Sequence, residues 1–212
     1  MERQWFTNKN CTSLEIKRYN SISDHEVKQS VKIGDLKFIQ RLMNRIEKIN
    51  SDGDKMKSFS RDAELIELLF NSENGPQTIQ IIQHGFKTPS TGFNSTNEVE
   101  ESLYNDINEL LLPGFNHTIP LVTNLELMLP GFSITYTGSE TQDLAPATVS
   151  FTVNKFQLRD KKGQEQTIKI RSGQTPPQPI KVEVNGKEFT ILTYQTKELQ
   201  RLYPDYFQIV SQ

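Results

Sequence analysis

The stretch NELLLPGFNHTIPLV, residues 108–122, separates two parts of the chain that differ in hydrophobic periodicity. Upstream of it, helical and strand patterns alternate, whereas downstream almost every segment has the period of two that is typical of a strand. Pro113 and Gly114 end the upstream helix, because proline cannot continue a helix and glycine readily adopts the left-handed conformation that closes one. We therefore predict an α+β domain over residues 1–116 and a domain resembling a β-sandwich over residues 117–212.

The strongest helical pattern of the chain begins after Asp35, a residue that can accept hydrogen bonds from the first backbone N–H groups of a helix. The apolar residues that follow recur at intervals of three and four, which predicts one stripe facing a core. These residues are Leu36, Ile39, Leu42, Met43, Ile46 and Ile49. Two strands are predicted before this helix, at Leu14–Tyr19 and Val27–Ile33.

A hairpin and a second helix complete the first half. The runs Ala63–Phe70 and Thr78–Gln83 flank Ser72–Pro76, a turn sequence in which Asn74 or Gly75 can adopt a positive φ. A loop rich in small polar residues, Thr88 to Thr96, follows the hairpin. The second helical stripe consists of Val99, Leu103, Ile107, Leu110 and Leu111. The order β-β-α-β-β-α predicts an antiparallel sheet with two helices that cover one face.

The second half is punctuated by turn sequences every 8–12 residues or so, and we expect six or seven short strands there. Pro130-Gly131 and the loop Asp160 to Gly163 each separate two alternating runs. Asn185-Gly186 is the strongest hairpin signal, because both positions of such a turn require positive φ. The strands are predicted at residues 125–129, 132–136, 148–159, 166–171, 180–184, 187–194 and 206–210. A small β-sandwich or open barrel accommodates such a pattern.

The composition and net charge of the chain indicate whether nucleic acid or a membrane is an expected partner. The formal net charge is −2 and the isoelectric point is about 6.0, so no overall field attracts nucleic acid, which makes nucleic acid an unfavoured partner. No uninterrupted apolar stretch approaches the roughly 18 residues that a membrane span needs. Because no basic segment leads into an apolar one near Met1, we expect a soluble protein and favour the cytoplasm, although an exported chain without its signal would look the same.

Sequence motifs for catalysis or cofactors are missing. The chain has no Gly-x-Ser-x-Gly elbow, no Gly-x-Gly-x-x-Gly fingerprint and no phosphate-binding loop. Cys11 is the single cysteine, which excludes an internal disulfide and any zinc site with several thiolates. His25, His84 and His117 are isolated from one another and from an obvious partner. We therefore predict no cofactor, no metal site and no catalytic residues, which favours a protein that is not an enzyme.

Lys37, Arg41, Arg45 and Lys48 are spaced by four, four and three residues, so they form a cationic row along one side of the first helix. Such a row can hold phosphates or an acidic partner. It is also typical of an ordinary solvated helix face, and Asp35 and Glu47 dilute its charge.

We consider three hypotheses for the function and give them in order of preference. The first is a non-enzymatic binding or interaction protein whose partner is another protein or an unknown ligand, acting through surface contacts; the loops of the β-rich half could form the recognition surface. The second is a small hydrolase with a site between the two halves that uses His84 or His117. The third is anion or nucleic-acid binding along the Lys37 to Lys48 row. The first half has the general outline of small α+β modules found in many bacterial proteins, but such an outline implies no function.

Overall fold

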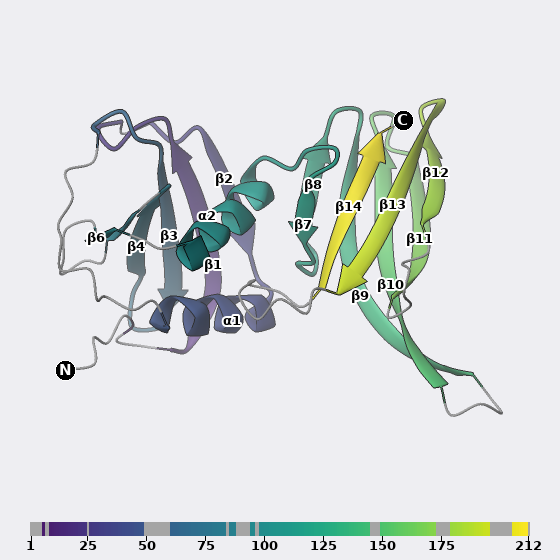
Figure 1. Cartoon of the computed structure of the whole chain (residues 1–212), viewed down its shortest axis with the longest axis horizontal. Helices are drawn as coiled ribbons and strands as arrows, with labels where there is room; N and C mark the ends of the chain where they lie inside the picture. Colours follow the sequence, from purple (N-terminus) through teal and green to yellow (C-terminus); the bar gives the residue numbers. More distant parts are fainter. Residues whose placement is uncertain are drawn as a thin grey trace. The chain divides into compact units, whose positions relative to one another are not determined.

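The structure is a computed structural model that describes residue 6 and residues 9–24, 26–48, 60–83, 85–87, 94–95, 98–144, 149–172, 179–195 and 205–211. The described residues form two compact units, which meet in the sequence between Leu111 and Leu112 (Figure 1). The sequence placed this boundary after residue 116. That each unit is a domain able to fold by itself stays a prediction, whereas a mixed α+β fold rich in antiparallel sheet is confirmed.

Among its described residues, the first unit forms a six-stranded antiparallel sheet with the strand order β2-β1-β3-β4-β5-β6. Its strands are β1 (Cys11–Tyr19), β2 (Gln29–Ile33), β3 (Leu65–Ser72), β4 (Gln77–Ile82), β5 (Gly85–Lys87) and β6 (Asn94–Ser95). The β3–β4 hairpin confirms the turn predicted at residues 72–76, and Gly75 has a φ of 102°. β5 was not predicted, and β6 lies in a segment predicted as a loop. Strands of three and two residues are too short for alternation to reveal.

Helix α1 (Leu36–Glu47) begins as predicted, because Asp35 accepts a hydrogen bond from the backbone N–H of Phe38 at 3.1 Å. Its buried residues are Phe38, Ile39, Leu42, Met43 and Ile46. The prediction was wrong for Leu36, which is 58% exposed, and it missed Phe38. Leu36 lies about 90° around the helix from the centre of the buried stripe, at the border with solvent. Ile49 lies outside the described residues.

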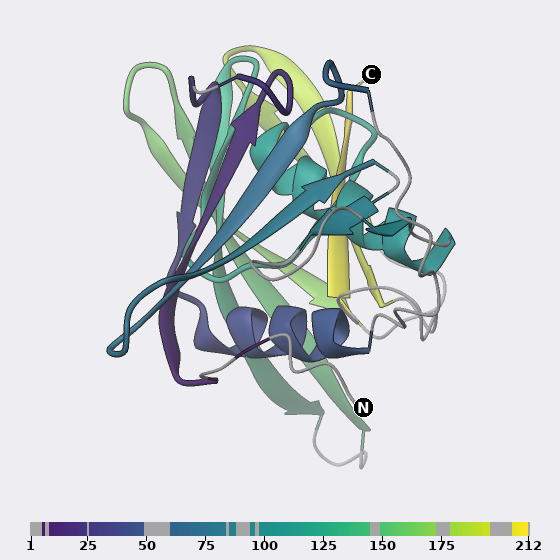
Figure 2. The ribbon, with the colours of Figure 1, turned by 90° about the vertical axis from the view of Figure 1, so that its left-hand side faces the viewer.

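Helix α2 (Glu98–Leu111) buries Leu103, Ile107, Leu110 and Leu111 as predicted, together with Tyr104. The first unit's sheet has one buried face, to which alternate residues of β1 and β3 such as Ile16 and Leu68 contribute, while the residues between them are polar or partly exposed. In Figure 2 the strands of this sheet cross in front of α2, and α1 runs beneath them. A sheet with a single apolar face packs against the apolar stripes of amphipathic helices.

The second unit contains two four-stranded antiparallel sheets, ordered β11-β10-β9-β8 and β12-β13-β14-β7. The strands of the first of these sheets are β8 (Glu126–Leu129), β9 (Phe132–Leu144), β10 (Val149–Asp160) and β11 (Glu165–Ser172). The strands of the second sheet are β7 (Thr118–Pro120), β12 (Ile180–Val184), β13 (Lys187–Gln195) and β14 (Asp205–Ser211). Phe156 of β10 contacts Phe207 of β14, with ring centres 5.3 Å apart, so the two sheets face each other across a shared core.

The hairpin turns of the second unit follow the predicted residues. Asn185 and Gly186 have φ values of 53° and 73°, which are the positive angles that this turn requires. Gly131 and Gly163 also have positive φ, at 111° and 80°. The strand β7 was missed, because Thr118–Pro120 is only three residues long and carries a proline.

Candidate functional site

Three turns of the second unit lie together at one end of its two sheets. The amide of Asn185, in the β12–β13 turn, donates a hydrogen bond of 3.1 Å to the carbonyl of Gly131, in the β8–β9 turn. Residues of the β10–β11 turn and of β12 line a common hollow. We call this region, formed by residues 130–131, 160–166 and 183–186, the turn end.

Asp160 fixes the conformation of the β10–β11 turn. Its Oδ1 accepts hydrogen bonds from the backbone N–H groups of Lys162 and Gln164, both at 2.8 Å. The backbone N–H of Gly163 donates to the Asp160 carbonyl at 3.0 Å, and the N–H of Asp160 donates to the Gln164 carbonyl at the same distance. A carboxylate that accepts several backbone N–H groups holds a turn in one arrangement, so this part of the turn end is preformed.

The hollow at the turn end has a volume of about 140 Å³ and an acidic polar lining. It is lined by Leu158, Asp160, Gln164, Glu165, Gln166, Glu183, Val184 and Asn185. Three of the lining residues are acidic, Asp160, Glu165 and Glu183, and none is a lysine or an arginine. Small-molecule sites usually enclose about 300–1,000 Å³, so this hollow fits one side chain or one small charged group and not a nucleotide.

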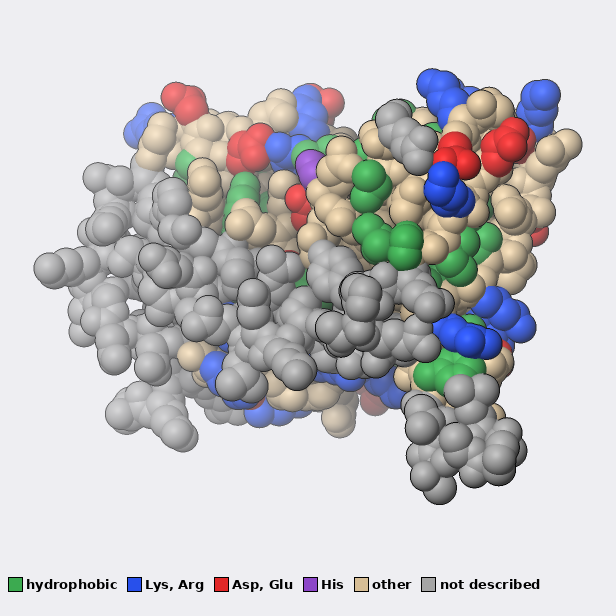
Figure 3. All heavy atoms as spheres, turned by 45° about the vertical axis from the view of Figure 1, so that its right-hand side comes forward, with side chains coloured by type: hydrophobic (Ala, Val, Ile, Leu, Met, Phe, Trp, Pro, Cys, Tyr) green, Lys and Arg blue, Asp and Glu red, His purple; other side chains and the backbone are tan. Residues whose placement is uncertain are grey.

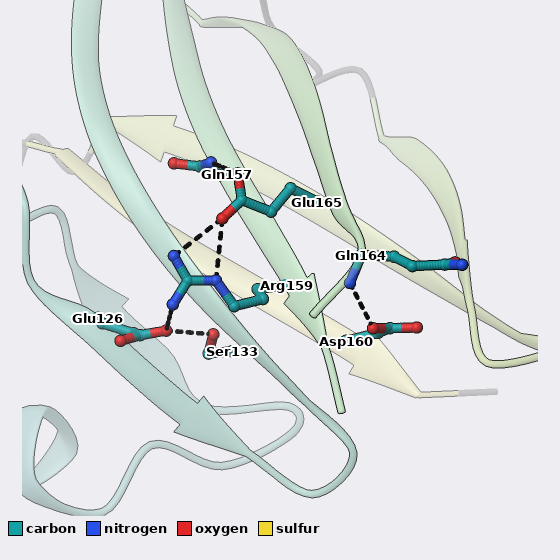
Figure 4. A network of polar contacts seen from close by, with 7 residues as sticks. All are labelled: Glu126, Ser133, Gln157, Arg159, Asp160, Gln164 and Glu165. Carbon is teal, nitrogen blue, oxygen red and sulfur yellow. Dashed lines mark hydrogen bonds and ion pairs between the residues drawn. The ribbon is translucent and has the colours of Figure 1, made fainter. Parts of the chain in front are cut away.

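Arg159 ties the lining residue Glu165 to the outer face of the sheet (Figure 4). Its Nη2 and Nε lie 2.9 and 3.0 Å from Oε1 of Glu165, and its Nη1 lies 3.5 Å from Oε1 of Glu126. Ser133 donates to Glu126, and Gln157 donates to Glu165. Each exposed contact of this kind contributes only about 0–1 kcal/mol, but the network restricts where the Glu165 carboxylate can point.

Charges of both signs are mixed on the surface. Figure 3 shows a face on which lysine, arginine, aspartate and glutamate side chains are interspersed over the described residues and do not gather into a large patch of one sign. The mixture of charges on this face agrees with the small net charge of −2. Local charges of this kind select a ligand by close contact, since long-range attraction needs a larger field.

The structure places the predicted cationic row on the exposed side of α1. Lys37, Arg41 and Lys48 are exposed and Arg45 is partly exposed. At 3.6 residues per turn the four positions fall within about 80° of arc, centred about 130° from the middle of the buried stripe. The neighbouring Glu47 is ion-paired with Lys9, with Nζ and Oε2 2.7 Å apart. The row is thus a real surface feature, and whether it binds anything stays a prediction.

Two residues of types that often act in catalysis, Cys11 and His117, lie in the part of the chain that the structure describes. Burial raises the pKa of the Cys11 thiol, which disfavours the reactive thiolate. His117 closes a turn in which its backbone N–H donates to the Gly114 carbonyl at 3.4 Å. His25 and His84 lie outside the described residues. Among the described residues, no three histidine, cysteine or acidic side chains come together as a metal site would require.

Comparison with known proteins adds no assignment. No protein-family model matches the chain, and neither a curated protein nor a solved structure is significantly similar to it. Within the described residues, no helix has both the length and the apolar character needed to cross a membrane. The sequence predicts the turns at residues 160–163 and 185–186, but it does not show that residues of both turns line one hollow. No local signal reports that two turns about 20 residues apart become neighbours.

Proposed function

We propose that the chain is a non-catalytic binding protein that contacts a partner protein, and that the turn end receives a cationic side chain of that partner. The observation that carries the proposal is the hollow of about 140 Å³ whose lining residues include three acidic residues and no basic one. Functional contacts are commonly made by loops that a rigid scaffold positions, and the turn end is such a set of loops on two packed sheets.

The chemistry of the lining favours a guanidinium or ammonium group. Among the lining residues, Asp160 and Glu183 carry carboxylates, and a third carboxylate, on Glu165, is already ion-paired with Arg159. Amide oxygens come from Gln164, Gln166 and Asn185. Arginine presents five N–H donors that match such acceptors, and charge-assisted hydrogen bonds are about twice as strong as neutral ones. Because backbone N–H groups hold Asp160, its carboxylate needs little reordering on binding.

The proposal is tested by titrating the full chain with N-acetyl-arginine methylamide, followed by NMR or calorimetry. The neutral citrulline analogue, of nearly the same shape, is the ligand control. We expect millimolar affinity for the arginine compound, since one side chain makes few contacts, and affinity at least tenfold weaker for the citrulline compound. Equal affinity for the two compounds would contradict a charge-selective site.

A matched pair of variants locates the binding. Glu183→Gln removes a charge from the lining, and Glu73→Gln removes the same charge from an exposed turn of the first unit. Glu183→Gln is expected to weaken arginine binding several-fold, because an acidic residue of the lining loses its charge, while Glu73→Gln leaves the affinity unchanged. Equal effects of the two substitutions would mean that the ligand responds only to net charge.

The exposed basic row on α1 supports a second candidate function, the binding of polyanions. Binding of this type releases counterions and therefore weakens steeply as salt concentration rises. The double substitution Arg41→Glu/Arg45→Glu is expected to lower affinity for heparin more than tenfold. The matched control, Lys161→Glu/Lys162→Glu, makes the same charge change in the β10–β11 turn. If both double variants lose affinity equally, the row is not a specific anion site.

A further inference from the structure

Strand β11 is the longest strand at the edge of any sheet among the described residues. It has eight residues, against five for β2 and β12, four for β8, three for β7 and two for β6. In the described part of the chain it pairs with β10 alone. A long edge strand offers a row of backbone N–H and C=O groups that can pair with another strand, and natural proteins usually shorten or block such an edge.

The hairpin geometry shows which residues of β11 offer these groups. The backbone N–H of Asp160 points toward β11, where it donates to the Gln164 carbonyl. In an antiparallel pair, the backbone N–H and C=O groups of every second residue point to the same side, so those of Leu158, Phe156 and Asn154 also point toward β11. Their partners Gln166, Ile168 and Ile170 therefore use their backbone groups toward β10. The backbone groups that point toward the open edge belong to Glu165, Thr167, Lys169 and Arg171.

These four outward residues form a self-complementary set. In an antiparallel pairing of β11 with a second copy of itself, a two-fold axis at Ile168 places Glu165 opposite Arg171 and Thr167 opposite Lys169. Both combinations occur twice, and no like charges face each other. All four outward residues pair in hydrogen-bonded positions, which allows eight backbone hydrogen bonds across the edge.

Neighbouring registers fit less well. An axis at Lys169 would place two lysines opposite each other, and like charges directly opposite are destabilising. An axis at Thr167 would move Arg171 past the end of the other strand, so fewer backbone groups would pair. The side chains of all four outward residues are exposed. The guanidinium group of Arg171 lies 4.5 Å from the centre of the Phe151 ring, a cation–π contact that restricts its position.

We propose that two copies of this chain associate by antiparallel pairing of their β11 strands, which joins two four-stranded sheets into one eight-stranded sheet. The two-fold axis passes at Ile168, and the same surface is used by both copies, as in other closed dimers. The inward residues Ile168 and Ile170 are already buried within each copy, at 6% and 0% exposure, so the contact is polar and modest in area. We expect a dissociation constant in the micromolar range, typical of a small interface.

The test is sedimentation equilibrium of the full chain from about 1 to 500 µM, a range that brackets micromolar affinity. Wild type is expected to shift from monomer to dimer over this range. Thr167→Pro removes an N–H that points away from β10, so it leaves the ladder within the chain intact but blocks the new edge. It is expected to weaken dimerisation at least tenfold, whereas Thr167→Val, which keeps the N–H, is expected to dimerise like wild type.

A charge exchange gives an independent answer if Thr167→Pro fails to fold. Arg171→Glu places two glutamates opposite each other and is expected to weaken dimerisation at least tenfold. Adding Glu165→Arg restores opposite charges and is expected to recover most of the affinity. A wild type that stays monomeric at 500 µM overturns the proposal, as does unchanged dimerisation of folded Thr167→Pro or a double variant no better than Arg171→Glu.

Discussion

The α1 face of the first unit and the turn end of the second unit are both exposed and charged, but they hold their charges differently. On α1, Lys37, Arg41 and Lys48 extend from a regular helix, with backbone groups satisfied within the helix itself. At the turn end, backbone N–H groups hold Asp160, and Arg159 holds Glu165. A row of long basic side chains suits binding that depends on charge and salt, whereas fixed carboxylates around a hollow suit selective contact with one group.

If the two units fold as separate bodies, a core substitution has the largest effect on stability and acts only within its own unit. Phe156 is fully buried in the second unit against Tyr136 and Phe207. Phe156→Ala should destabilise this unit by about 3–5 kcal/mol, because a cavity is added to the loss of apolar contact. Phe38→Ala makes the matching change in α1 of the first unit, where Phe38 is also fully buried.

Hydrogen exchange resolved by residue measures the two effects. Each substitution is expected to reduce protection only in its own unit, with the other unit exchanging as in wild type. Equal loss of protection in both units after either substitution would show that the chain unfolds as one cooperative body, and the contrast between two independent surfaces would be lost.

An intermediate effect is expected when the turn end loses its anchor. Asp160→Ala removes the acceptor of two backbone hydrogen bonds, which should lower the stability of the second unit by about 1–2 kcal/mol. It should also abolish selective arginine binding, since the hollow loses its preformed turn. Asp160→Asn keeps an acceptor oxygen and serves as the control in urea unfolding. Full arginine affinity in folded Asp160→Ala would show that preformed carboxylates are not what distinguishes the turn end from α1.

The smallest effect is expected at the start of α1. Asp35→Ala removes the side-chain acceptor for the N–H of Phe38 and should cost about 1 kcal/mol of first-unit stability. Asp35→Asn, which can still cap the helix, should cost little, and thermal unfolding followed by circular dichroism distinguishes the two variants. The basic row should remain on the helix in both, because a frayed first turn affects Lys37 and leaves Arg41 to Lys48 in place.

The sequence predicted features that local physical chemistry determines. The helical stripes of α1 and α2 follow from a period of 3.6, and the Asn185-Gly186 hairpin follows from the need for positive φ. The pairing of β1 with β3 could not be predicted from local patterns. Leu14 lies opposite Phe70, and these residues are far apart in the sequence. The hollow could not be predicted either, because Asp160 and Glu183 line it together only after two hairpins have packed side by side.

Whether the turn end is a specific binding site for an arginine side chain is tested by mapping backbone amide chemical shifts by NMR. N-acetyl-arginine methylamide is added to the full chain at moderate salt. We expect saturable shifts concentrated at residues 160–166 and 183–186, with α1 unaffected. Shifts that are spread over acidic residues of both units, or that never saturate, would contradict this prediction, because they would show general charge attraction in place of a binding site at the turn end.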